Sequence, residues 1–226
     1  MAAERSIIGM IDHAVLAADA TRDDVLAACE LGAELGVAGV CVQPWWVEVT
    51  AAALEGTGVA VGTVAGFPLG ASLSDAKAFE ARRAIVQGAD EVDMVIALTA
   101  LKSGDYDAVR EDVAAVVGAA YAVAVEQPIV KAILEMCYLT QEEKRIAAEL
   151  AVEGGADFVK TSTGFGPSGA TVEDVRLLRA LVPEHVGVKA AGGIRTLEQA
   201  RAMVEAGATR IGASATRAMA EELGGQ

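Results

Sequence analysis

Three of the six lysines of this chain lie in segments that otherwise consist largely of apolar residues. Lys131, Lys160 and Lys189 each follow a valine directly. Burying an ion costs several kcal/mol, so a lysine in such a place needs either a neutralising carboxylate or a chemical purpose. A buried lysine that loses its proton becomes a nucleophile toward carbonyl groups. These lysines are therefore the first candidates for catalysis.

Carboxylates occupy similar apolar segments at Asp12, Asp93 and Glu135. One interpretation is a buried structural network, in which each lysine is neutralised by an acid. The convergence of several acids and lysines on one interior favours chemistry instead. For Lys131 and Glu135 we retain the structural interpretation, as a supporting ion network.

Lys160 and Lys189 stand at corresponding points of consecutive apolar segments, which predicts that their ammonium groups lie close together. An ordinary lysine with a pKa of about 10.4 is neutral in about one molecule in 2500 at pH 7, whereas a pKa near 7 makes about half of the molecules neutral. A neighbouring ammonium and an apolar wall both lower a lysine pKa. One of the two is therefore expected to give up its proton readily.

The elements that carry these residues alternate between strand-like and helical patterns along the whole chain. Eight strands are expected at Met10–Leu16, Val37–Gln43, Val59–Phe67, Glu91–Leu98, Ile129–Glu135, Ala156–Thr161, Val186–Ala191 and Arg210–Ala213. Each precedes a helical pattern, the first of which is capped by Thr21 and ended by Gly36. Because no GxGxxG follows the first strand, a single (β/α)8 TIM barrel over residues 1–226 is favoured over a doubly wound sheet.

Glycines follow the last two expected strands, where barrels often bind phosphate. Gly192 and Gly193 come after strand seven, ahead of a capping-box pattern formed by Thr196 and Gln199. At the end of strand eight come Gly212 and Ser214. Glycines let backbone N–H groups approach an oxyanion, so both loops predict a phosphate site, although tight turns alone would also account for them.

Composition limits the partners. A net charge of −14 argues against nucleic acid and against an anionic membrane surface. The longest apolar stretch, Val113–Val125, is too short to span a bilayer, and the start lacks signal-peptide features, so we expect a cytoplasmic protein. Three scattered cysteines and two histidines predict no metal site.

Several motifs, in family order over nearly the whole chain, closely resemble the deoxyribose-phosphate aldolase family. The most specific is Asp157-Phe158-Val159-Lys160-Thr161-Ser162-Thr163-Gly164-Phe165. Others are Ile11-Asp12-His13, Cys41-Val42-Gln43-Pro44, Gly66-Phe67-Pro68-Leu69-Gly70, Ala89-Asp90-Glu91-Val92-Asp93-Met94-Val95 and Val188-Lys189-Ala190-Ala191-Gly192-Gly193-Ile194-Arg195.

The resemblance implies a cofactor-free and metal-free class I aldolase that reversibly cleaves 2-deoxy-D-ribose 5-phosphate to acetaldehyde and D-glyceraldehyde 3-phosphate. It implies that Lys160 is the Schiff-base lysine and that Lys189 depresses its pKa and moves protons. Asp93 would be the acid/base carboxylate, and Asp12 would hold the second lysine. The phosphate loops are implied at Gly164, Gly192, Gly193, Gly212 and Ser214. A homo-oligomer, either a dimer or a tetramer, is also expected.

The chain departs from the family pattern at Ala14, where threonine is common, and at Ala97-Leu98-Thr99, where asparagine often follows the catalytic aspartate. Phe165 stands where some members carry lysine. The first two changes remove polar groups that could position water near the substrate. None removes a residue proposed for catalysis.

Other residues have simpler interpretations. Cys41 is expected to be a buried thiol beside the site, and His13 to pack or form a hydrogen bond. Trp45 and Trp46 are expected at a helix start or a subunit contact.

Two rival functions remain open. One is a phosphosugar isomerase or epimerase on the same scaffold, which would use carboxylate or histidine bases or a metal. The other is a noncatalytic protein that binds or assembles around a sugar phosphate. A covalent imine would discriminate against both.

Overall fold

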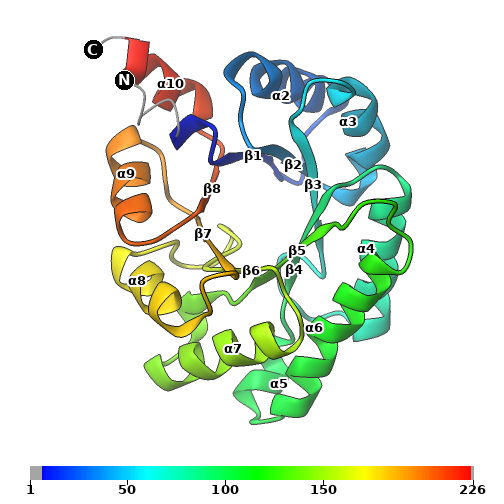
Figure 1. Ribbon diagram of the computed structural model, residues 1–226, viewed down its shortest axis with the longest axis vertical. Helices are drawn as coiled ribbons and strands as arrows, with labels where there is room; N and C mark the ends of the chain where they lie inside the picture. Colours follow the sequence, from blue (N-terminus) through cyan, green and yellow to red (C-terminus); the bar gives the residue numbers. More distant parts are fainter. Residues whose placement is uncertain (1–6, 225–226) are drawn as a thin grey trace.

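The computed structural model describes residues 7–224, and it confirms the predicted (β/α)8 barrel. Eight parallel strands close into a ring in sequence order, with β1 paired to both β2 and β8. The helices surround this ring (Figure 1). The predicted domain range, 1–226, includes two ends that lie outside the described residues.

The strands and helices alternate as the sequence predicts. The strands are β1 (Ile11–Val15), β2 (Gly39–Val42), β3 (Ala60–Ala65), β4 (Glu91–Val95), β5 (Ile129–Ile133), β6 (Phe158–Lys160), β7 (Gly187–Ala191) and β8 (Arg210–Ala213). The helices are α2 (Arg22–Leu35), α3 (Val47–Leu54), α4 (Ser74–Val86), α5 (Leu98–Lys102), α6 (Tyr106–Tyr121), α7 (Gln141–Glu153), α8 (Val172–Leu181), α9 (Leu197–Glu205) and α10 (Thr216–Gly224). Short 3-10 helices follow β2 and β5, at η1 (Pro44–Trp46) and η2 (Met136–Tyr138).

Most predicted strands were too long at their ends. The fourth was expected to continue to Leu98, but β4 ends at Val95 and Leu98 begins the short helix α5. The backbone turns there because the Leu98 N–H donates to the carbonyl of Ile96 rather than to a neighbouring strand. An apolar run in the sequence does not show at which residue the hydrogen bonding to the neighbouring strand ends.

Helix ends follow the predicted capping chemistry. Thr21 and Asp24 form a capping box at the start of α2, and Gly36 ends that helix with a φ of 65°. Thr196 and Gln199 form a second capping box at the start of α9. The caps confirm both helix starts that the sequence specified.

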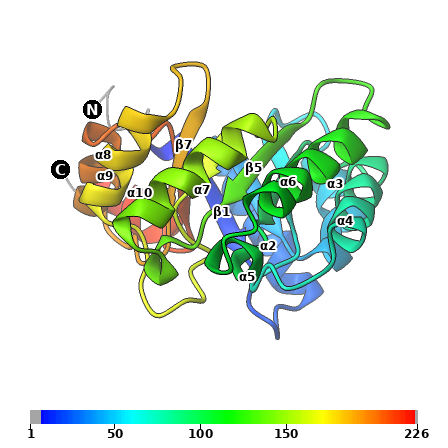
Figure 2. The same cartoon turned by 90° about the horizontal axis from the view of Figure 1, so that it is seen from below.

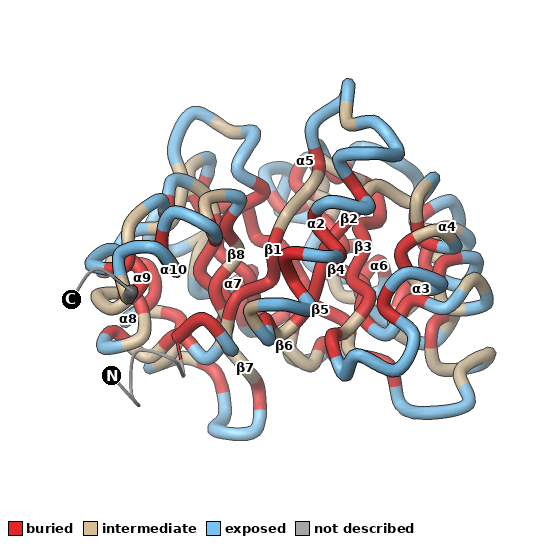
Figure 3. The backbone as a smooth tube through the Cα atoms, turned by 90° about the horizontal axis from the view of Figure 1, so that it is seen from above, coloured by how far each residue is buried: buried red, intermediate tan, exposed pale blue. Residues whose placement is uncertain are grey.

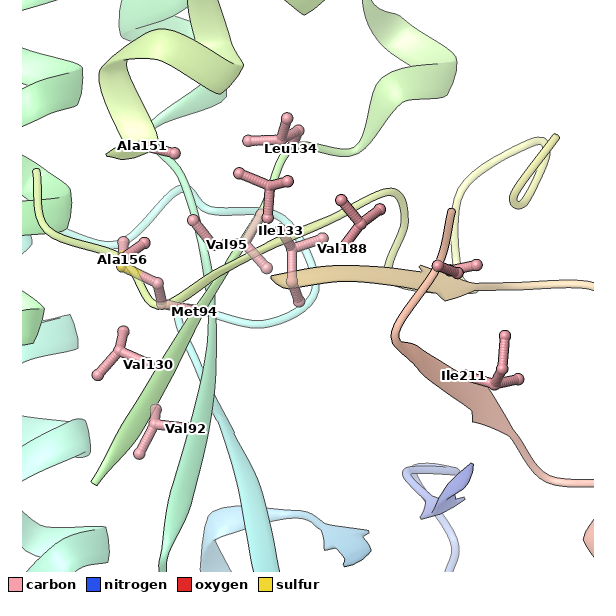
Figure 4. Close-up of a cluster of buried hydrophobic side chains, with 14 of the residues drawn as sticks. Val92, Met94, Val95, Val130, Ile133, Leu134, Ala151, Ala156, Val188 and Ile211 are labelled. Atoms are coloured by element: carbon pink, nitrogen blue, oxygen red, sulfur yellow. The ribbon is translucent and has the colours of Figure 1, made fainter. Parts of the chain in front are cut away.

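The main core lies between the outer face of the barrel and the helices. Figure 4 shows part of it, including Val92, Met94 and Val130 from neighbouring strands β4 and β5 and Ala151 from α7. Figure 2 shows α6 and α7 lying across the outside of the barrel. The central strands are buried whereas the outer helix surfaces are exposed (Figure 3). No helix within residues 7–224 has the length and apolarity to cross a membrane.

A buried ion pair that the sequence analysis did not identify joins α4 to α6. The Lys77 ammonium donates to Asp112 Oδ2 at 2.7 Å and to the Val95 carbonyl at 2.9 Å, and neither charged side chain is exposed. Ser74 donates to the other Asp112 oxygen. Burial lowers the pKa of Lys77, although Asp112 opposes that shift. The pair therefore ties the end of β4 to the two helices outside it.

Asp112→Ala should lower the free energy of unfolding by about 3–5 kcal/mol, because it leaves the Lys77 ammonium buried without its partner. Urea denaturation would measure the change. The double variant Lys77→Met/Asp112→Leu should lose less stability than Asp112→Ala, because no buried charge remains. Asp107→Ala removes an exposed carboxylate from the same helix and should change stability little. A double variant less stable than Asp112→Ala would contradict this account.

Candidate active site

A cavity of about 650 Å3 opens at the carboxyl ends of the strands, the end at which barrel enzymes carry their active sites. Eight of the nine residues predicted for the site line it, namely Asp12, Lys160, Gly164, Lys189, Gly192, Gly193, Gly212 and Ser214. The ninth, Asp93, is buried and in direct contact with two lysines of the cavity. The structure therefore brings the predicted residues together.

The carboxylate of Asp93 on β4 accepts hydrogen bonds from three lysines. Its Oδ2 accepts hydrogen bonds from Lys160 Nζ and Lys189 Nζ, both at 2.7 Å, and its Oδ1 accepts one from Lys131 Nζ at 2.9 Å. The strand register produces this arrangement, since Lys160 lies directly beside Lys189 and Asp93 directly beside Lys131. The predicted proximity of Lys160 and Lys189 is confirmed.

Two further residues, Glu91 and Arg210, complete a set that we name the lumenal ion cluster. Arg210 donates to Asp12 at 2.6 Å and to Glu91 at 3.0 Å, while Lys131 contacts Glu91 and Lys189 contacts Asp12. The members are Asp12, Glu91, Asp93, Lys131, Lys160, Lys189 and Arg210.

Sequence analysis missed Glu91 and Arg210. A signal existed for Glu91, because it precedes Asp93 by two residues and strand residues two apart share a face. Arg210 begins its strand, which is a common place for a surface cation. Nothing in the sequence separated it from the other arginines.

The charges of the cluster single out Lys160. The cluster holds three carboxylates and four cations, and Lys160 has only one carboxylate contact, to an oxygen that it shares with Lys189. Lys189 contacts two carboxylates and Lys131 three. If Lys160 is neutral, three cations face three carboxylates. Lys160 is therefore the cation that the cluster compensates least.

The pKa shifts agree with this balance. Burial lowers the pKa of Lys160, and the charge of Lys189 lowers it further against the opposing effect of Asp93. Burial also acts against the Lys189 ammonium, but Asp12 and Asp93 together outweigh it and raise that pKa. Lys131 and its neighbours hold the pKa of Asp93 well below its usual range despite burial. Both carboxylates of the cavity floor therefore stay ionised, since Asp12 is shifted in the same direction.

A small apolar cluster, separate from the main core, stands beside the lysines. It consists of Leu16, Cys41 and Val64, packed with Ala14 and Phe67. As predicted, Cys41 is a buried thiol at the cavity, and burial raises its pKa to about 11. This apolar wall has the property required to favour a neutral amine at Lys160.

The glycine loops lie at the outer part of the cavity. Gly164, Gly192 and Gly193 have φ values of 88°, 89° and 78°, a conformation that favours glycine. Gly212 has a different constraint, because a side chain there would meet Ala191 at 2.8 Å and the Lys189 stem at 3.2 Å. Its glycine makes room for the lysine.

Arg195 also lines the cavity, and it was not among the predicted site residues. It is the only cationic side chain of the cavity lining besides Lys160 and Lys189. Its position two residues after the Gly-Gly turn was visible in the sequence.

One expectation was wrong in part. Lys131 belongs to the ion cluster as expected, but Glu135 forms no ion pair within the described residues. Glu135 lies beyond the end of β5 in a left-handed conformation, and its carboxylate bonds to Thr163 instead. The turn after the strand directs the side chain toward the β6–α8 loop.

The remaining predicted features are also located. His13 donates or accepts a 2.8 Å hydrogen bond with Thr216, which agrees with a packing role. Trp45 and Trp46 lie in η1, directly before α3, as predicted for a helix start.

Of the departures from the family pattern, Ala14 and Phe165 line the cavity, whereas Ala97 precedes α5 and is not among the residues that line the cavity. Within residues 7–224, no three metal-ligating side chains form a possible metal site.

A parallel barrel whose lumen holds paired lysines, one of them poorly compensated, has the groups that an aldolase of the Schiff-base class requires. The model of the DeoC/LacD family aldolases matches residues 6–221, so the chain belongs to this family.

Individual relatives agree with this assignment. Deoxyribose-phosphate aldolase from Thermoanaerobacter sp. (strain X514) is 52% identical over 217 residues, which cover 96% of each chain. That from Thermococcus gammatolerans is 54% identical over 206 residues, 90% of each chain. The tetrameric deoxyribose phosphate aldolase structure from Aeropyrum pernix superposes with a TM-score of 0.90 at 31% identity, covering 99% of this chain and 93% of that one.

The cysteines offer a test of this buried environment. At pH 8, a thiol with a pKa of about 11 is ionised in only about one molecule in 1000, and Cys41 and Cys29 are both buried. Iodoacetamide should therefore modify the half-buried Cys137 of the folded protein at least ~10 times faster than either of them. Peptide mass mapping would measure the rates, with urea-unfolded protein as the control. Faster modification of Cys41 than of Cys137 would contradict the described burial.

Proposed function

We propose that this protein is a class I aldolase that reversibly cleaves 2-deoxy-D-ribose 5-phosphate to acetaldehyde and D-glyceraldehyde 3-phosphate. One observation carries the proposal: Lys160 is the least compensated cation of the lumenal ion cluster and lies on the cavity. Its lowered pKa makes the neutral amine available, and a neutral amine can attack an aldehyde. The family assignment supports the same reaction.

In the proposed reaction, Lys160 Nζ attacks C1 of the open-chain sugar. The resulting carbinolamine loses water to form an iminium ion. A base then removes the proton of the C3 hydroxyl. The C2–C3 bond breaks, its electron pair moves toward the iminium nitrogen, and glyceraldehyde 3-phosphate leaves. Protonation of the resulting enamine at C2 and hydrolysis of the imine release acetaldehyde and the free lysine. The imine serves as the electron sink, so the proposed reaction needs no metal or cofactor.

We assign the proton transfers to Asp93 and Lys189. Lys189 Nζ donates a hydrogen bond to Asp93 Oδ2 at 2.7 Å, and the same oxygen also accepts a hydrogen bond from Lys160. A proton can therefore pass between these groups without leaving the buried cluster. Asp12 contacts Lys189 and holds its ammonium at the cavity floor. We propose that Asp12 positions Lys189.

We place the substrate phosphate at the outer glycine loops. Gly164, Gly192 and Gly193 leave the cavity wall free of side chains, so that backbone N–H groups can approach an anion. Ser214 is exposed on the cavity and offers a hydroxyl, and Arg195 offers a positive charge. Gly212 contributes by making space for the Lys189 stem.

The rival functions make less use of this site. An isomerase or epimerase with a carboxylate or histidine base gains nothing from a second lysine beside the first. A noncatalytic sugar-phosphate binder has no need for a poorly compensated lysine, whose burial costs stability. Neither rival is favoured by a specific contact in the described cavity.

The setting of the enzyme is also proposed. The tetrameric relative from Aeropyrum pernix supports a homo-oligomer, a dimer or tetramer, for this chain. Exposed apolar side chains offer contact surface, with Trp45 84% and Leu73 81% exposed. A cytoplasmic location fits the three cysteines, which are free thiols in the structure.

Borohydride reduction in the presence of acetaldehyde should link the two-carbon unit to Lys160, and Lys160→Ala should abolish this trapping. Lys189→Leu should retain the nucleophile but raise its pKa toward the usual value, because a neighbouring positive charge is lost. Trapping by Lys189→Leu should therefore be slow at pH 7 and recover as the pH approaches 10.

Peptide mass mapping identifies the labelled residue, and Lys102→Leu controls for the loss of an exposed lysine. Labelling of Lys189 in the unmodified protein would exchange the two proposed roles. Labelling of neither would refute the aldolase mechanism.

Ser214→Asp should raise KM for 2-deoxyribose 5-phosphate about tenfold or more, because it adds negative charge where the phosphate is proposed to bind. KM for unphosphorylated 2-deoxyribose should change much less. Steady-state kinetics would measure both, and Ser214→Ala separates the loss of the hydroxyl from the added charge. Equal effects on the two substrates would place the phosphate elsewhere.

A further inference from the structure

Glu135 has an unusual backbone conformation at the edge of the cavity. It is the only non-glycine residue within residues 7–224 with a positive φ, and its φ of 48° and ψ of 60° are left-handed. Glutamate pays a steric cost in this region, which glycine would avoid. The surrounding structure must therefore compensate for keeping a glutamate here.

The Glu135 carboxylate holds the loop between β6 and α8. It accepts a hydrogen bond from the Thr163 backbone N–H at 3.1 Å and another from the Thr163 hydroxyl. The Thr163 oxygen in turn accepts the Phe165 N–H at 3.0 Å. Thr163, Gly164 and Phe165 all line the cavity. One side chain thus fixes three consecutive residues of the cavity wall.

These bonds continue the pairing of two strands beyond their ends. The Leu134 N–H donates to the Lys160 carbonyl and the Met136 N–H to the Thr161 carbonyl, both at 2.9 Å. Past Thr161 the backbones separate, and the Glu135 side chain takes over the connection. This connection from Glu135 to Thr163, which we name the Glu135 clamp, therefore lies three residues after Lys160, the proposed nucleophile.

The fit around the carboxylate is close, and it is not explained by charge. Glu135 is 2% exposed, and within the described residues no cation pairs with it. A side chain at Gly166 would lie 3.3 Å from the Glu135 carboxyl carbon. A buried carboxylate held only by neutral donors is costly, so it marks a position where the loop geometry matters.

We propose that Glu135 is a positioning residue, which sets the Thr163–Phe165 segment against the bound substrate and so determines the preference for phosphorylated sugar. This inference rests on the proposed function. Glu135 itself does not line the cavity, so it acts through Thr163 and Gly164. Releasing the clamp frees Gly164, one of the residues proposed to approach the phosphate.

The test compares Glu135→Gly with Glu135→Gln. The glycine variant removes the backbone cost together with the clamp, and it should lower the kcat/KM ratio of 2-deoxyribose 5-phosphate to 2-deoxyribose by about tenfold, mainly through KM. The glutamine variant keeps the length and one acceptor oxygen, so it should recover most of that loss. Glu142→Gln removes an exposed carboxylate nearby in the chain and serves as the matched control.

A second variant covers the case in which Glu135→Gly does not fold. Thr163→Val removes the hydroxyl that links Glu135 to Phe165, without changing the backbone at Glu135. It should lower the same ratio, and in the double variant Glu135→Gly/Thr163→Val the two losses should not add, since both break one connection.

The outcomes separate this inference from the proposed function. Equal loss on both substrates in these variants, or an unchanged ratio, would overturn the positioning role while leaving the aldolase assignment intact. Absence of aldol cleavage and of acetaldehyde trapping in the unmodified protein would refute the proposed function instead.

Discussion

The carboxylate of Asp93 is the contact on which the rest of the site depends. Three buried lysines from three strands donate to it, and without it their ammonium groups would face one another in the buried lumen. Neighbouring ammonium groups repel one another strongly in a buried environment. Asp93 on β4 is therefore the one carboxylate of the lumenal ion cluster that all three lysines share.

The same contact makes the three lysines unequal. Lys131 and Lys189 have additional carboxylates, Glu91 and Asp12, whereas Lys160 has none. The reactivity proposed for Lys160 then needs no special property of the lysine itself. It follows from the number of carboxylates that contact each lysine and from the apolar cluster of Leu16, Cys41 and Val64 beside them.

The sequence was sufficient for the architecture because each element carries its own signal. Apolar runs, capping residues and glycines repeat along the chain, and a charge within a strand is conspicuous. Strand ends were poorly predicted, as Leu98 shows, because pairing depends on the neighbouring strand. Lys77 and Asp112 were missed because each looks like an ordinary polar residue of a helix. Glu135 was misassigned because its left-handed turn reverses the direction that strand alternation predicts. Partners that meet only after folding leave no local pattern.

The distribution of charge also explains how a chain with a net charge of −14 can offer a place for an anion. The cavity acids nearest the lysines are already neutralised within the ion cluster, so they contribute little net field outside it. Toward the opening, glycine turns expose backbone and Arg195 adds a positive charge, whereas the exposed carboxylates of Asp19 and Asp24 line the cavity from the β1–α2 segment. Salt screens the repulsion between a bound anion and distant surface charges. Backbone N–H groups and a guanidinium instead contact the anion directly, where screening is weak. The local arrangement therefore decides what the cavity can bind: the glycine turns and Arg195 favour an anion on their side, and Asp19 and Asp24 disfavour it on the side of the β1–α2 segment.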